Sequence, residues 1–217
     1  MESQFPMLEK SKDVISINST RFHTGLVKYY TNAHLPNFKP IESFSVGDIT
    51  VPLENNGVSL RYIPELAKFF GKKTTVSINF ADKNDLSLKS EAILEIPPPI
   101  EIIDDTPNSN NFIRGDALRW VAGNQNDDIF IAISFNNSSF LNEEFETAPS
   151  VYRYKLVKDI GITILTASDF SGIPSGAYVE VNVTRAKAVI AGGTTNGSGA
   201  SAVVSSISSA TVGGTLN

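Results

Sequence analysis

Large apolar residues occupy every second position along much of this chain of 217 residues. A period of two places one set of side chains on the buried face of a strand and the other set in solvent. Long stretches with the period of about 3.6 residues that marks an amphipathic helix are missing. The pattern therefore predicts an all-β protein.

The predicted strands are short and rich in Ile, Val, Thr and aromatic residues. Turn residues separate them at spacings of about ten residues, which is typical of β-sandwiches. The strands are expected at residues 14–18, 57–62, 74–80, 92–96, 100–103, 117–121, 129–135, 151–157, 161–166 and 177–184. One short helix is expected at residues 63–70, with Pro64 near its start and Gly71 at its end.

The stretch EIPPPIEI, residues 95–102, divides the chain into two parts. Three consecutive prolines fix φ and cannot donate to a β-ladder, so we expect an extended connector here. We therefore predict two β-sandwich domains in tandem, one over residues 1–97 and one over residues 98–190.

The remaining segment, residues 191–217, changes composition sharply toward Gly, Ser, Thr, Ala and Val. Such a composition is typical of a flexible, low-complexity tail. However, SAVVSSISSATV within it combines small residues with strand propensity. We therefore expect packing or strand pairing to order the tail from Ala191 to Asn217, along a sheet edge of this molecule or of a protein partner.

The distribution of charged and apolar residues argues against a nucleic-acid partner and against a membrane-spanning helix. The net charge of −5 arises in residues 98–190, which carry 7 basic and 12 acidic residues, and no basic stripe is present for nucleic acid. No apolar run approaches the roughly 20 residues of a membrane-spanning helix. The first residues lack the basic end and apolar core of a signal peptide, so the chain is either cytosolic or a mature form without its leader.

The stretch DIGITILTASDFSGIPSGAYVEVNVTR, residues 159–185, is the most informative part of the sequence. It predicts two strands joined by a corner that one helical turn and Pro174 close. Tyr178 opens the second strand, where its hydroxyl is expected to bond the corner backbone, as in the tyrosine corner of immunoglobulin-like sandwiches. Trp120 is expected on an earlier strand of the same core.

These residues resemble the second half of secreted and lipid-anchored β-sandwich proteins of the Bacteroidetes type. A D-x-G-x-x-x-I strand, a D-[LF]-x-x-[IL]-P-x-G corner and a V-x-R strand end recur in those proteins. Here the motifs correspond to Asp159, Gly161 and Ile164, to Asp169, Phe170, Ile173, Pro174 and Gly176, and to Val183 and Arg185. The resemblance, mainly over residues 113–187, implies an immunoglobulin-like sandwich and a location in the periplasm, at the outer membrane or on the cell surface.

The polar run NQNDD, residues 124–128, is a candidate calcium site. Asp127 and Asp128 supply oxygen ligands of the kind that calcium prefers, and Asp104 and Asp105 end the preceding strand. The same residue types are what a tight connection between strands requires. The turn is the favoured interpretation, and no cofactor is expected.

The sequence gives no catalytic constellation. The nucleophile motif GxSxG and a phosphate-binding Gly-Lys-Ser/Thr loop are absent. His23 and His34 lack the spacing of a zinc-binding helix. We therefore expect a protein that is not an enzyme.

Two tyrosine pairs are candidate ligand contacts. Tyr152 and Tyr154 share one face of a predicted strand with Leu156, and Tyr29 and Tyr30 lie in an aromatic loop. If these pairs are exposed, their rings can stack on sugar rings, which predicts glycan binding. The favoured interpretation is that Tyr152, Tyr154 and Leu156 form the core face of their strand.

The function that these patterns predict is a structural or binding component of an outer-membrane or cell-surface assembly, outside the cytoplasm. Such a component would bind protein partners through the surfaces of its sandwiches and by pairing of edge strands, including residues 191–217. The alternatives are a glycan-binding module and a structural subunit of a virion or secretion machine.

Overall fold

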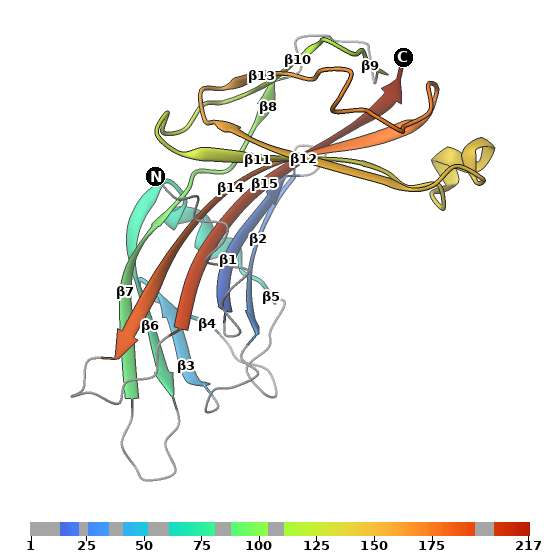
Figure 1. Ribbon diagram of the computed structural model, residues 1–217. Helices are drawn as coiled ribbons and strands as arrows, with labels where there is room; N and C mark the ends of the chain where they lie inside the picture. Colours follow the sequence, from blue (N-terminus) through green and yellow to red (C-terminus); the bar gives the residue numbers. More distant parts are fainter. Residues whose placement is uncertain are drawn as a thin grey trace. The chain divides into compact units, whose positions relative to one another are not determined.

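The computed structural model describes residues 14–21, 26–34, 41–51, 61–80, 88–103, 111–193 and 202–217. Over these ranges the chain consists of strands, connecting loops and two short 3-10 helices (Figure 1). The prediction of an all-β protein is confirmed.

The described residues divide into two compact units. Unit 1 takes its residues from 1–20, 27–99 and 186–208, and unit 2 from 21–26, 100–185 and 209–217. The step from Pro99 to Ile100 between the units falls inside the proline-rich connector. Residues 191–217, treated above as a separate tail, contribute to both units.

Unit 1 is built on strands ordered β4-β3-β6-β7-β14-β15-β1-β2-β5. The elements are β1 (Val14–Arg21), β2 (Val27–His34), β3 (Ile41–Val46), β4 (Ile49–Val51), β5 (Arg61–Tyr62), the helix η1 (Pro64–Phe69), β6 (Lys72–Phe80), β7 (Leu88–Ile96), β14 (Tyr178–Gly193) and β15 (Ala202–Leu216). The last two also belong to unit 2. The short helix was predicted, and Gly71 follows it at φ +81°, a conformation that favours glycine.

Strand β15 accounts for the described end of the tail, residues 202–217. Ser205 and Ser206 are both 0% exposed although they are neighbours, so both faces of this strand are covered. Their hydroxyls donate to the carbonyls of Ile15 and Ile17, at 3.5 and 3.0 Å. Small hydroxyl side chains therefore let β15 lie between β14 and β1, inside its own molecule.

Unit 2 has two sheets around one core. Its strands are β8 (Ile102–Ile103), β9 (Asn111–Phe112), β10 (Ala117–Trp120), β11 (Asp128–Phe135), β12 (Val151–Lys158) and β13 (Ile162–Ile164), with the helix η2 (Phe140–Phe145) between β11 and β12. One sheet runs β12-β11-β14-β15-β9 and the other β13-β10-β8. Trp120 is buried in the core, as expected.

A buried ion pair ties the two sheets of unit 2 together. The Asp159 carboxylate accepts hydrogen bonds from the Arg185 guanidinium, at 2.6 and 3.0 Å, and from the Trp120 indole N–H, at 2.8 Å. Arg185 also donates to the carbonyl of Val121. A Cβ at Gly123 would collide with Asp159, so glycine is required where the chain passes over the pair.

The tyrosine corner expected at Tyr178 is not formed. Val179 and Val181 fill the core, so alternation places Tyr178 on the opposite face of β14. The corner is held by the buried Asn142 of η2 instead. Its side chain accepts from the N–H of Tyr178 at 2.7 Å and donates to the carbonyls of Tyr178 and Asn136, each at 3.0 Å.

We expect Arg185→Met to lower the free energy of unfolding by about 3–5 kcal/mol, because it leaves the Asp159 carboxylate charged, buried and unpaired. Chemical denaturation followed by tryptophan fluorescence measures the loss. Lys72→Met, at an exposed lysine of β6, is the matched control and should change stability by about 0.5 kcal/mol or less. Equal losses for the two variants would contradict a structural role for the pair.

Candidate functional site

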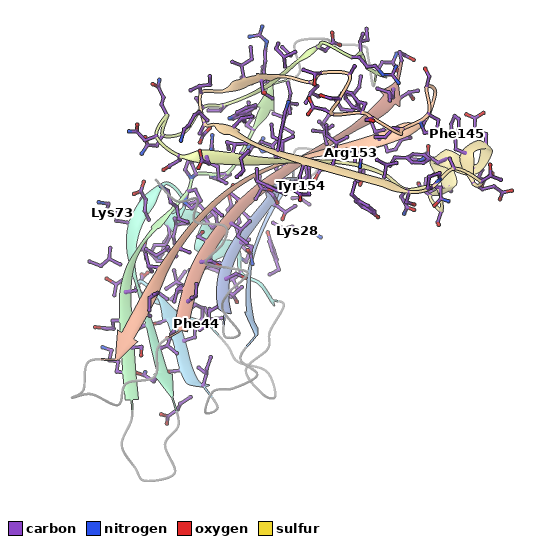
Figure 2. All side chains as sticks on the ribbon, in the orientation of Figure 1. Lys28, Phe44, Lys73, Phe145, Arg153 and Tyr154 are labelled. Carbon is purple, nitrogen blue, oxygen red and sulfur yellow. The ribbon has the colours of Figure 1, made fainter. Side chains whose placement is uncertain are left out.

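The outward side of β12 carries the two candidate tyrosines. Tyr152 is 66% exposed and Tyr154 is 78% exposed, and Leu156 is exposed with them. The prediction that these three residues form the core face is therefore wrong. Tyr154 and Arg153 project to opposite sides of β12 (Figure 2).

Two basic residues of β12, Arg153 and Lys155, take the inward side, where they bind the end of β13 and the segment that follows it. The ammonium of Lys155 donates to the carbonyl of Ile164 and to the carboxylate of Asp169, each at 2.8 Å. The guanidinium of Arg153 donates to the carbonyl of Ser171 at 2.9 Å. These contacts give the charged ends of Arg153 and Lys155 hydrogen-bond partners at the margin of the sandwich. Long basic side chains can therefore occupy inward positions of β12, where apolar residues are usual.

The register of three strands defines a surface that we call the aromatic face. β11 pairs antiparallel with both β12 and β14, so outward side chains meet in rows across the strands. The rows are Tyr152–Ser134–Glu180, Tyr154–Ala132–Asn182 and Leu156–Phe130–Thr184. In these rows Tyr152 and Tyr154 lie at the β12 margin with Phe130 on the neighbouring strand, and Glu180, Asn182 and Thr184 lie at the β14 margin.

The aromatic margin is held in place before any ligand arrives. The rings of Phe130 and Tyr154 stack with centroids 5.8 Å apart and planes inclined by 26°. Such a contact restricts the tyrosine side chain, which lowers the conformational entropy lost on binding.

The polar margin is a short hydrogen-bonded ladder. The hydroxyl of Thr184 donates to the Asn182 side chain at 2.6 Å, and the Asn182 amide donates to the Thr211 hydroxyl at 2.9 Å. Glu180 is exposed on the same strand. The hydrogen bonds orient the Asn182 and Thr184 side chains, and together with Glu180 these groups provide both donors and acceptors.

The second tyrosine pair lies in unit 1. The ring of Tyr29 packs against the core and lies 5.0 Å from the ring of Phe70, so it is part of the packing of that unit. The side chain of Tyr30 lies outside the described part of the structure.

The NQNDD segment forms a turn. The N–H of Asp127 donates to the carbonyl of Asn124 at 2.9 Å, and the N–H of Asn126 donates to the Asn124 side chain at 3.1 Å. Asp128 is paired with Lys158 at 2.8 Å. Asp104 and Asp105, the other carboxylates of the calcium hypothesis, lie outside the described residues, as does His23.

Within the described ranges, no three His, Cys, Asp or Glu side chains gather as a metal site. None of the helices in the described part of the chain is long and apolar enough to cross a membrane.

The chain matches no protein-family model, and comparisons with curated proteins and with solved structures give no match either. The site must therefore be interpreted from its own geometry.

The Asp169 carboxylate makes the corner after β13 sensitive to acid. Burial opposes its ionisation, but hydrogen bonds from Lys155 and from the N–H and hydroxyl of Thr166 outweigh burial and lower the pKa of Asp169 below its ordinary value of 3.8. A carboxyl group with a lowered native pKa stabilises the fold above its unfolded-state pKa, and this contribution is lost as pH falls through the native pKa.

We expect Asp169→Asn to cost about 1–2 kcal/mol at neutral pH, less than a fully buried charged group because the site is partly solvated. The difference from the unsubstituted protein should shrink as the pH falls below 3.8, which urea titrations over a pH series measure. Asp116→Asn, at an exposed carboxylate, is the matched control. A difference that stays constant across the acidic range would show that the charge of Asp169 is unimportant.

Proposed function

We propose that this protein is a non-enzymatic binding component of an outer-membrane or cell-surface assembly, and that it binds glycans outside the cytoplasm. The observation that carries the proposal is the aromatic face of unit 2, where exposed tyrosines share a surface with oriented amide and hydroxyl groups. The extracytoplasmic location rests on the resemblance of residues 113–187 to secreted β-sandwich proteins.

Glycans match the chemistry of this face. A pyranose ring presents an apolar C–H face, which stacks on the electron-rich face of an aromatic ring, and hydroxyl groups around its edge. Tyr152 and Tyr154 supply large aromatic surfaces with few rotatable bonds, so little entropy is lost on binding. Glu180, Asn182 and Thr184 supply acceptors and donors for hydroxyl groups.

The layout of the face favours an oligosaccharide over a single sugar. Tyr152 and Tyr154 are two residues apart on one strand, about 7 Å, and the polar ladder on β14 lies two strand spacings from β12, about 10 Å. Ala132, with only a methyl group, stands between Tyr154 and Asn182. A chain laid across the strands would therefore stack one sugar on the rings and present the next to Asn182.

We further propose that unit 2 is an immunoglobulin-like sandwich. Its two sheets around a core that contains Trp120 support this assignment. The corner differs from that of antibody-type domains, because Asn142 holds the backbone of Tyr178.

A glycan array followed by calorimetry on the strongest oligosaccharide hit tests the proposal. We expect Tyr154→Ala to weaken binding at least tenfold, about 1.4 kcal/mol, and Tyr152→Ala and Asn182→Ala to weaken it as well. The matched control is Tyr62→Ala, because Tyr62 is an exposed tyrosine of unit 1. An array without hits, or hits that survive loss of both β12 tyrosines, would refute glycan binding by this face.

A further inference from the structure

The connection between β11 and β12 presents an apolar tip. Phe140 is 78% exposed and the adjacent Leu141 is also exposed, both at the start of η2. Single exposed apolar residues are common on protein surfaces. Two neighbours at a projecting connection form a surface suited to contact with another molecule. We call Phe140 and Leu141 the tip.

The tip is held on a fixed support. The Ser139 hydroxyl accepts from the N–H of Leu141 at 3.3 Å, and the buried Asn142 bonds the start of β14. The ring of Phe145, labelled at η2 in Figure 2, packs edge-on against Phe135 with centroids 6.3 Å apart. A preformed apolar contact loses less entropy on association than a mobile loop does.

The surroundings of the tip are acidic. Residues 136–150 contain Glu143, Glu144 and Glu146 and no Lys or Arg, so the connection carries a charge of −3. The three glutamates are exposed. A partner of the tip therefore needs an apolar site with basic residues around it.

Unit 1 contains such a site between β7 and β14. These strands pair at Glu91–Gly192 and Ser90–Gly193, and further along both strands a surface pocket of about 260 Å³ opens. Its apolar lining consists of Ile93, Leu94, Ala188 and Val189. Ile93 is 67% exposed, so its side chain stands at the mouth of the pocket.

The margin of the pocket is basic on balance. Lys73 and Lys187 line it together with Glu95, which gives a net charge of +1. Lys73 projects outward from unit 1 (Figure 2). The pocket thus has the apolar lining and the sign of charge that the tip requires.

We propose that copies of this protein associate head to tail, with the Phe140 tip of one copy in the β7–β14 pocket of the next. A cavity of about 150 Å³ accommodates benzene, so the pocket has room for the Phe140 ring. Glu143 and Glu144 of one copy then lie near Lys73 of the other, where opposite charges favour this orientation. The tip and the pocket are different surfaces, so the contact is heterologous and builds either a closed ring or an open row of copies.

Sedimentation velocity over a concentration series of about 1 μM to 1 mM tests the association. The average mass of the full chain should rise with concentration, and added salt should reduce the rise. Phe140→Ser and Ile93→Ser should each weaken self-association at least tenfold. Ile160→Ser removes an exposed isoleucine of unit 2 outside the tip and should leave association unchanged.

A mixture of the two variants gives the sharper result. Phe140→Ser keeps an intact pocket and Ile93→Ser keeps an intact tip, so an equal mixture should form heterodimers and nothing larger. Both substitutions are at exposed positions, and unchanged unfolding midpoints confirm that each variant is folded. A wild-type chain that stays monomeric over the whole series, or a mixture that stays monomeric, would overturn the proposal.

Charge reversal tests the orientation of the contact. Lys73→Glu alone and Glu143→Lys/Glu144→Lys alone should each weaken association. In a mixture, the basic tip of the double variant should dock beside the acidic pocket margin of the Lys73→Glu variant, so association between the two proteins should be restored. Failure of this rescue would show that the tip does not dock beside Lys73.

Discussion

The burial of alternate residues on β11 determines what unit 2 presents to other molecules. Ile129, Ile131, Ile133 and Phe135 fill the core, and a slip of one residue would move all four into solvent. Because β11 pairs with β12 on one side and β14 on the other, its register sets the rows of the aromatic face. The same strand supplies Phe135, on which Phe145 packs to hold η2. Both the aromatic face and the apolar tip therefore depend on this strand.

The ion pair of Asp159 and Arg185 gives a physical reason for two of the motifs noted in the sequence. The aspartate of the first motif and the arginine that ends the last one lie 26 residues apart, and each neutralises the other inside unit 2. Either charge alone would be costly to bury. Trp120 and the Val121 carbonyl complete the hydrogen bonds of the pair, which links β10, the turn before β13 and β14.

The sequence predicted the strands whose apolar residues alternate strictly, and missed strands in which this alternation is interrupted. β11 was placed within one residue of its observed start. β2 and β3 were not predicted. In β3 the buried residues are Ile41, Phe44 and Val46, and the register shift between Ile41 and Ser43 breaks the alternation of apolar positions. For β15 the sequence predicted strand pairing but not its place between β14 and β1, where Ser205 and Ser206 are buried. For the site, Tyr152 and Tyr154 were identified as candidates. Phe130, Asn182 and Thr184 were missed, because only the register of three strands brings them to the tyrosines.

The misassigned face of β12 shows why such a site is hard to find from one sequence. In VYRYKLVK, aromatic and basic residues alternate, and hydropathy alone places the aromatic set inside. β12 has a described neighbour only on its β11 side, and basic residues that point inward discourage pairing at an open edge. Arg153 and Lys155 can point inward because the last residue of β13 and the backbone after it supply carbonyl acceptors for them. Those hydrogen bonds leave the tyrosines in solvent, so a polar contact at the sheet margin creates the aromatic surface.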